Sequence, residues 1–331
     1  MQPRNKPLQL NSMISPDSID LVGVGLNATD TLIRLPEFPQ RGSKLEYDTE
    51  SLMPGGQVAS TVVACQTWGL RTRYVGKLGD DDASRLHARE FDRTGVDARL
   101  INVADAPSPK SLIMVDQDGE RTVLCRRDDR LILQPNELRR EWITDARALH
   151  VDGHDTSAAI QAASWAREAG LAVIADLDEI YPGVDALIEK IDYLIVSRDF
   201  PARLTGEKNL VKALREIHSR YGCQLTAATL GQGGVLAWNG NVAHHTPAYR
   251  VPAVDTTGAG DIFHAGFIFA LLQGWSLERQ LDFACAAAAI NCMAEGARGG
   301  ITALESIFKF MQSTAHYDES LEQVLQTEMS Y

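Results

Sequence analysis

The feature that most constrains the fold is a regular alternation of short apolar runs and helical segments through the middle of the chain. The apolar runs have the length of buried strands, and the segments between them have the spacing of amphipathic helices. They lie at 148–151, 156–169, 171–175, 193–196, 210–221 and 225–230. Strands that alternate with helices pack as a parallel sheet covered on both faces. The pattern therefore predicts an α/β fold with a doubly wound, mostly parallel sheet flanked by helices.

Two segments depart from this rhythm. Segment 31–54 is broken by prolines and glycines, and 107–127 has the pattern of a hairpin with its turn at 116–119. We expect these two segments to form a small β-sheet lid beside a main domain at 19–315. The remaining ends are predicted to be a flexible leader, 1–18, and a C-terminal tail, 316–331.

The composition disfavours several classes of function. A net charge of −12 argues against binding nucleic acid or an anionic membrane, because such surfaces need clustered Lys and Arg. The five cysteines are scattered and include no Cys-x-x-Cys pair, which argues against a disulfide framework or a zinc site. The apolar stretch 283–294 is shorter than the ~20 residues that span a bilayer, and the polar leader has no signal-peptide core. We therefore expect a cytoplasmic protein.

The strongest local signal is the segment 255–261, Asp-Thr-Thr-Gly-Ala-Gly-Asp, which precedes a largely apolar run. Such a segment opens a buried helix, whose first backbone N–H groups are unpaired and whose dipole is positive at that end. Gly258 and Gly260 let an anion approach the backbone closely, which predicts a phosphate site. Asp261 would face that anion and could accept a hydroxyl proton, an arrangement suited to phosphoryl transfer.

Three other patterns each lack a required feature. Residues 23–28 fit a dinucleotide-binding pattern, but 31–39 is extended where that pattern needs a helix. The sequence has no Gly-x-x-x-x-Gly-Lys-Ser/Thr loop, so we exclude a P-loop nucleotide site. His244 and His245 have no third metal ligand at a suitable spacing.

The segment 255–261 resembles the C-terminal signature of the ribokinase-like (PfkB) carbohydrate kinases. The segments 54–60 and 75–81 resemble the N-terminal region of that family, so the resemblance spans roughly 20–303. It implies ATP-dependent phosphorylation of a small sugar or ketose hydroxyl, with ATP and Mg²⁺ as co-reactants and a monovalent cation such as K⁺ as a further candidate. It also implies a ribokinase-like fold with a β-sheet lid, through which such proteins often form homodimers.

The resemblance carries roles onto individual residues of this chain. The catalytic residues would be Asp261 as the base and Gly258, Ala259 and Gly260 as the anion hole. The substrate-binding residues would be Asp30, Gly55, Gly56, Gln57 and Asp255. The nucleotide-binding residues would be Thr229, Gly231, Gly234, Asn291 and Ser197, and Asp199 would support the metal through water.

For most of these residues an ordinary structural role is also open. Asp261 could only cap the helix. The glycines at 55–56 and 231–234 could form plain turns, and Asp30 and Asn291 could be ordinary polar residues.

The chain also departs from the family pattern in two places. Relatives often carry Asn-x-x-Glu before the nucleotide loop, where this chain has Ser-Arg-Asp-Phe at 197–200, which resembles the ketohexokinase-like and sulfofructose-kinase-like branches. Relatives also often have Asn shortly after the glycine pair at 55–56, where this chain has Gln57 and Ser60. The first departure concerns how the metal is supported, and the second concerns how the sugar hydroxyls are recognised.

A cluster of charged residues leaves the charge of the substrate open. Arg121, Arg126 and Arg127 follow the predicted hairpin, and His154 and Asp155 follow a strand end, where ligands gather in open α/β sheets. An arginine here would suit a phosphate or sulfonate, although solvated surface arginines are an equal alternative. Two other functions also stay open, a nucleoside kinase of the same fold and a non-catalytic sugar- or nucleotide-binding regulator.

Overall fold

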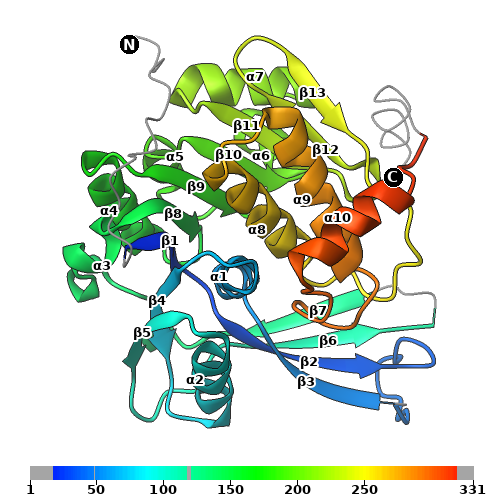
Figure 1. Cartoon of the computed structure of the whole chain (residues 1–331). Helices are drawn as coiled ribbons and strands as arrows, with labels where there is room; N and C mark the ends of the chain where they lie inside the picture. The colour runs from blue at the N-terminus through cyan, green and yellow to red at the C-terminus, as the bar shows by residue number, and fades with distance from the viewer. Residues whose placement is uncertain (1–17, 48, 118–120, 319–331) are drawn as a thin grey trace.

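A computed structural model describes residues 18–47, 49–117 and 121–318 of the chain (Figure 1). Nine strands of these residues form the main sheet. They are β1 (Ile19–Val24), β4 (Thr72–Leu78), β5 (Asp97–Asn102), β8 (Ala146–Asp152), β9 (Ala172–Leu177), β10 (Tyr193–Ser197), β11 (Leu225–Thr229), β12 (Val235–Trp238) and β13 (Ala243–Thr246). Their order is β13-β12-β11-β10-β9-β8-β1-β4-β5, and every neighbouring pair from β11 to β5 is parallel. The last two strands, β12 and β13, pair antiparallel.

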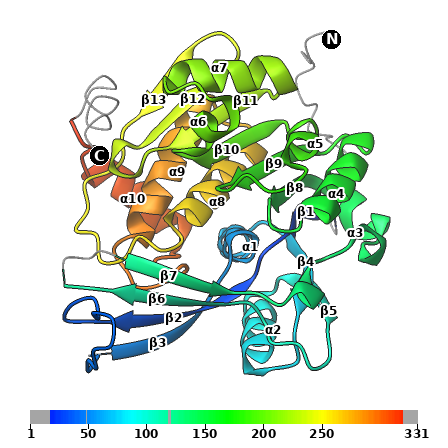
Figure 2. The ribbon, with the colours of Figure 1, turned by 180° about the vertical axis from the view of Figure 1, so that it is seen from behind.

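Helices cover both faces of this sheet, as the two opposite views show (Figures 1 and 2). One layer contains α1 (Gln57–Thr67), α8 (Ala259–Leu272), α9 (Leu277–Asn291) and α10 (Leu304–Ser313), with α2 (Asp82–Thr94) beside it. The other contains α3 (Arg140–Thr144), α4 (Thr156–Glu168), α5 (Val184–Ile188), α6 (Phe200–Thr205) and α7 (Leu210–Tyr221). Each layer buries its own hydrophobic cluster against the sheet, which confirms the predicted doubly wound architecture.

Helix α8 is buried along almost its whole length because it is apolar on all sides. It packs very closely on α9, since a Cβ on Gly266 would lie 2.8 Å from the Cα of Ala284. Tight packing of this kind fixes the position of the helix. The first turn of α8, where the glycine-rich segment lies, is therefore held by the core.

Four further strands form a separate small sheet. They are β2 (Ala28–Arg34), β3 (Thr49–Gly55), β6 (Lys110–Val115) and β7 (Arg121–Arg126), in the order β3-β2-β6-β7. The pairs β2–β3 and β6–β7 are antiparallel, and β2–β6 is parallel. This sheet confirms the small β-sheet predicted from 31–54 and 107–127, although β2 starts at Ala28, earlier than predicted.

Several predicted elements agree closely with the structure, and some predictions fall outside it. Helix α7 has the predicted bounds, and α2 ends at Gly95, whose φ of 81° gives the left-handed cap expected of glycine. Part of the predicted turn at 116–119 and most of the predicted leader and tail lie outside the described residues.

Short 3-10 turns occur at Asp129–Leu131, Pro135–Glu137 and Gly231–Gly233. Within the described ranges, no helix has the length and apolarity to cross a membrane.

Candidate active site

The glycine-rich segment forms the start of α8, as its sequence predicts. Gly258 is the residue before the helix, with a left-handed φ of 73°, and a Cβ on it would lie 2.4 Å from the carbonyl oxygen of Ala297. A Cβ on Gly260 would meet no atom within 4 Å. Gly258 is therefore needed for the turn, whereas Gly260 leaves open space beside the first helical turn, in which the N–H of Ala259 donates a 3.2 Å hydrogen bond to the carbonyl oxygen of Thr256.

Asp261 lies in this first turn and is partly exposed. Burial raises the pKa of Asp261 to about 7, helped by the nearby carboxyls of Asp176 and Asp30 and opposed by His264 and Arg298. A carboxyl with a pKa near neutrality can both take and release a proton at physiological pH, which is what a general base requires.

His264 holds this turn from inside the protein. Its Nδ1 donates a 2.8 Å hydrogen bond to the carbonyl oxygen of Gly260, and it lies 3.5 Å from a carboxylate oxygen of Asp176 on β9. Burial lowers the pKa of His264. Sequence reasoning missed both Asp176 and His264, although the place of Asp176 near the carboxyl end of a parallel strand was a usable signal.

Asp30 lies directly against the predicted glycine pair. A Cβ on Gly55 would lie 2.1 Å from a carboxylate oxygen of Asp30, and Gly56 has a left-handed φ of 93°. Burial raises the pKa of Asp30 to about 6, opposed by a hydrogen bond from Ser111 and the charge of Arg298. The structure therefore brings Asp30, Gly55 and Gly56 together, within electrostatic range of Asp261.

Arg298 is a buried cation that the sequence analysis did not identify. Its guanidinium donates hydrogen bonds to the carbonyl oxygen of Gly55 (2.7 Å) and the hydroxyl of Ser60 (3.1 Å), and it forms an ion pair with Glu90. Its side chain is 5% exposed, so the charge acts with little screening by water. Arg298 is consequently the cation that balances the carboxyls of this site.

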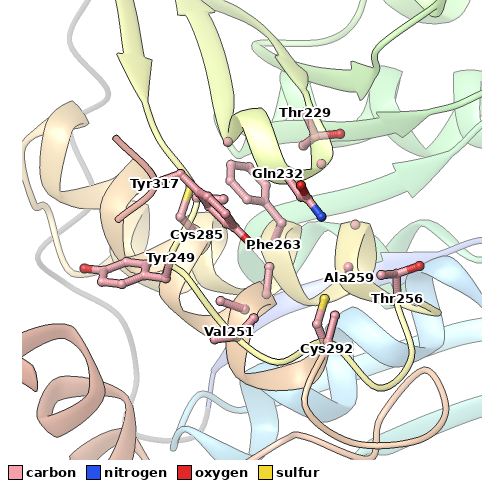
Figure 3. A pocket seen from close by; sticks show the side chains of 17 residues that line it. Thr229, Gln232, Tyr249, Val251, Thr256, Ala259, Phe263, Cys285, Cys292 and Tyr317 are labelled. Atoms are coloured by element: carbon pink, nitrogen blue, oxygen red, sulfur yellow. The ribbon is translucent and has the colours of Figure 1, made fainter. Parts of the chain in front are cut away.

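A cavity of about 390 Å³ begins at this turn (Figure 3). Its walls include Ala259 and Gly260 together with three residues predicted to bind the nucleotide, which are Thr229, Gly231 and Gly234. Thr229 ends β11, so the cavity lies at the carboxyl ends of the parallel strands, where ligands bind in open α/β sheets. The segment 231–234 is also the turn between antiparallel strands, so its structural and binding roles are compatible.

Two residues predicted to touch ligands, Asn291 and Asp255, form hydrogen bonds that hold loops together. Asn291 is fully buried; its side chain donates to the carbonyl oxygens of Thr257 (3.1 Å) and Ala297 (3.3 Å). The carboxylate of Asp255 accepts 2.8 Å hydrogen bonds from the backbone N–H groups of Thr257 and Gly296. The geometry favours a positioning role, in which these two side chains fix the glycine-rich turn against the loop that follows α9.

The predicted metal-supporting segment lies at the end of β10. The hydroxyl of Ser197 donates to the carbonyl of Asp178 over 3.4 Å, and Asp199 is exposed at the start of α6. The described part of the chain contains no group of three or more His, Cys, Asp or Glu residues placed to hold a metal ion. Mg²⁺ that accompanies a nucleotide commonly uses only one or two carboxylates besides phosphate and water, so this arrangement fits Mg²⁺ in that form.

The remaining residues singled out from the sequence are Gln57 and the arginines after the predicted hairpin. Gln57 is the first residue of α1 and directly follows the glycine pair. Arg127 forms an ion pair with Asp155 and donates a 3.2 Å hydrogen bond to the carbonyl oxygen of His154, so its charge is already balanced. Arg126 is exposed. This pairing favours the structural alternative for Arg127 over an anion site.

The fold and the site together have the features of a class, the α/β phosphotransferases, because a glycine-rich helix start lies beside a carboxyl group of raised pKa. Comparisons with known proteins then identify the family. A profile of the pfkB family carbohydrate kinases matches residues 20–304. The chain belongs to this family, which confirms the resemblance inferred above and with it an ATP-dependent phosphotransferase. Membership of a ketohexokinase-like or sulfofructose-kinase-like branch stays a prediction.

Individual relatives agree with this assignment. The chain is 29% identical to the ATP-dependent ribose-1-phosphate kinase of Halopiger xanaduensis, over 83% of this chain and 92% of the relative. It is 31% identical to the aminoimidazole riboside kinase of Salmonella typhimurium, over 76% of this chain and 84% of the relative. The structure of Arabidopsis thaliana ribokinase complexed with ribose and ATP matches with a TM-score of 0.77 at 26% identity, covering 89% of this chain and 99% of that one.

Proposed function

We propose that this protein transfers the γ-phosphoryl group of ATP to a hydroxyl group of a small sugar or ketose. The observation that carries the proposal is the position of Asp261. Its carboxyl, whose pKa is raised to about 7, lies in the same helical turn as the open backbone at Gly260. ATP supplies the activated phosphoryl group. The protein supplies alignment, charge neutralisation and a proton acceptor, which are the main needs of phosphoryl transfer.

Each part of the site has a separate task in this proposal. The backbone N–H groups at 258–260 would hold the transferred phosphoryl oxygens, because the first N–H groups of an α-helix have no acceptor within the helix. Without a nucleotide, the N–H of Ala259 donates to the carbonyl oxygen of Thr256 in the preceding turn. Asp261 would accept the proton of the attacking hydroxyl. Asp30, held against Gly55, would bind sugar hydroxyls, since an ionised carboxylate is a strong hydrogen-bond acceptor.

We propose Mg²⁺ as the companion of ATP, with Asp199 and Ser197 near its water shell. A monovalent cation such as K⁺ is a further proposal. Asp255 is an anionic side chain between the glycine-rich turn and the loop after α9, where it accepts hydrogen bonds from the N–H groups of Thr257 and Gly296. Gln57, which follows the glycine pair, is proposed to contact the sugar. Asn291 is proposed to act on the nucleotide through the loop that it holds rather than by direct contact.

A second candidate is a nucleoside kinase of the same fold. The 31% identity to a kinase that acts on a riboside favours it. The two candidates differ in whether the acceptor carries a base, and the acceptor side described above, with Asp30 and Arg298 buried together, suits a molecule rich in hydroxyl groups.

The test is ADP release in a coupled assay, with saturating ATP and Mg²⁺, over a panel of neutral sugars, ketoses, sugar phosphates and nucleosides. The proposal predicts turnover with at least one sugar or ketose, and loss of that turnover in Asp261→Asn. Turnover with nucleosides alone would favour the second candidate. Tight ligand binding without any turnover would instead favour a non-catalytic regulator.

We also propose a homodimer through the small sheet. Leu52 on β3 and Val123 and Leu124 on β7 expose about half of their surfaces, at 57%, 45% and 53%. Exposed apolar side chains gathered on one sheet are typical of an interface. A cytoplasmic location is proposed as well, because the cysteines in the described part of the chain form no disulfide bond.

A further inference from the structure

The end of the described chain returns to the domain as a short strap, residues 314–318. Two backbone hydrogen bonds of 2.9 Å attach it, one from the N–H of Arg250 to the carbonyl of Ala315 and one from the N–H of Tyr317 to the carbonyl of Ala248. The strap lies beyond the part of the chain that the family profile matches. Its contacts are therefore described from this chain alone.

Side chains fix the strap as firmly as the backbone does. His316 pairs with Tyr249 as an antiparallel bridge, and their rings lie 3.9 Å apart between centroids. The Nδ1 of His316 donates a 2.8 Å hydrogen bond to the carbonyl oxygen of Pro247, and the hydroxyl of Tyr249 donates one of 2.9 Å to Asp282 on α9. The next residue, Tyr317, is held in place by these contacts.

Tyr317 lines the same cavity as Ala259 and Gly260. Figure 3 shows Thr256 and Ala259 toward one end of the cavity, and Tyr249 and Tyr317 toward the other. The end near Ala259 is where the phosphate groups would bind. A nucleotide that fills the cavity from that end therefore places its base toward Tyr317.

The far end of the cavity has the character of a base-binding site. Val251, Phe263 and Cys285 line it together with Tyr317, so the surroundings are largely apolar. Aromatic faces stack on nucleobases, and such stacking depends little on which base is bound. The guanidinium carbon of Arg250 lies 5.6 Å from the centre of the Tyr317 ring, which helps to hold that ring.

We infer that Tyr317 binds the nucleobase of the phosphoryl donor, and that the strap 314–318 completes the nucleotide pocket from beyond the residues that the family profile matches. The inference rests on the proposed function, since it assumes that the cavity holds a nucleotide. It adds a binding residue that neither the glycine-rich turn nor the loop at 231–234 provides.

The test compares Tyr317→Phe, Tyr317→Leu and Tyr317→Ala with the unchanged protein. Isothermal titration with ATP gives the dissociation constant, and steady-state kinetics gives kcat and the KM of the acceptor. Tyr317→Phe keeps the ring, Tyr317→Leu keeps only apolar bulk, and Tyr317→Ala removes both. Melting temperatures check that each variant is folded; if Tyr317→Ala is not, the comparison of Phe with Leu decides.

We expect ATP binding about tenfold weaker in Tyr317→Ala, weakened in Tyr317→Leu, and unchanged in Tyr317→Phe, as for the loss of one stacked base. The acceptor KM and kcat should stay the same in all three. Equal ATP affinity in folded Tyr317→Leu and unchanged protein would overturn the inference, as would a parallel loss of acceptor binding. If the unchanged protein binds no ATP, the proposed function itself fails, a result visible without any variant.

Discussion

Arg298 donates a 2.7 Å hydrogen bond to the carbonyl oxygen of Gly55, a residue 243 positions earlier in the chain. Gly55 touches Asp30, which is proposed to bind the acceptor, and Ala297, the neighbour of Arg298, packs against Gly258, which is proposed to bind phosphate. One loop therefore joins the two halves of the site. The charge of Arg298 also acts on the carboxyls at its centre.

Replacing Arg298 by Gln should shift the pH dependence of catalysis. The positive charge lowers the pKa of Asp261, which lies at about 7, so its removal raises that pKa. Because the base must be ionised, the acid limb of the kcat/KM profile should move to higher pH. Arg85→Gln, at an exposed position on α2, is the matched control. A limb that stays in place would show that Arg298 is only structural.

Replacing Asp30 by Asn should shift the same limb in the opposite direction. The negative charge of Asp30 raises the pKa of Asp261, so its loss lets the base ionise at lower pH. The KM of the acceptor should rise at the same time, because Asp30 is proposed to bind sugar hydroxyls. An unchanged acceptor KM would remove Asp30 from the acceptor site.

Replacing Asp261 by Asn should lower turnover by ~10²–10⁴-fold while ATP still binds, as for the loss of a general base. The variant should also melt at a higher temperature than the unchanged protein at pH 8. The folded-state pKa of Asp261, about 7, lies above its ordinary value of 3.8. Stability therefore falls as the pH rises from the ordinary pKa to the folded-state pKa, and Asn avoids this loss. Asp82→Asn, an exposed change on α2, is the control for both measurements.

Substitutions at the two glycines of the turn should have different effects. Gly258→Ala should lower the melting temperature, because its φ is 73° and a Cβ would meet Ala297. Gly260→Val should keep the fold, since a Cβ there has open space, but weaken ATP binding by filling the cradle. Calorimetry and nucleotide titration separate the two effects. Unimpaired ATP binding by Gly260→Val would argue against the cradle.

The parts of the site that sequence reasoning found are local in the chain. The turn at 258–260 and Asp261 follow from one short segment, because helix starts and glycine turns are set by neighbouring residues. The alternation of strands and helices likewise predicts the doubly wound sheet. Helix α7 has the predicted bounds because its amphipathic face and the Gly222 cap are both local signals.

The parts that sequence reasoning missed depend on distant contacts. Arg298 meets Glu90 and Gly55 only because the loop after α9 lies over α1 and α2, and a lone arginine in the sequence gives no sign of this. Tyr317 reaches the cavity through a bridge between Tyr249 and His316, which no periodicity predicts. Asn291 was predicted near the nucleotide, but whether it touches a ligand or a loop depends on side-chain direction.

A crystal structure with a non-hydrolysable ATP analogue and Mg²⁺ would show directly whether the first turn of α8 binds the terminal phosphate. We predict that the terminal phosphate accepts hydrogen bonds from backbone N–H groups at 258–260, with the carboxylate of Asp261 facing it across the space for the acceptor hydroxyl. A terminal phosphate bound away from the first turn of α8 would contradict the account.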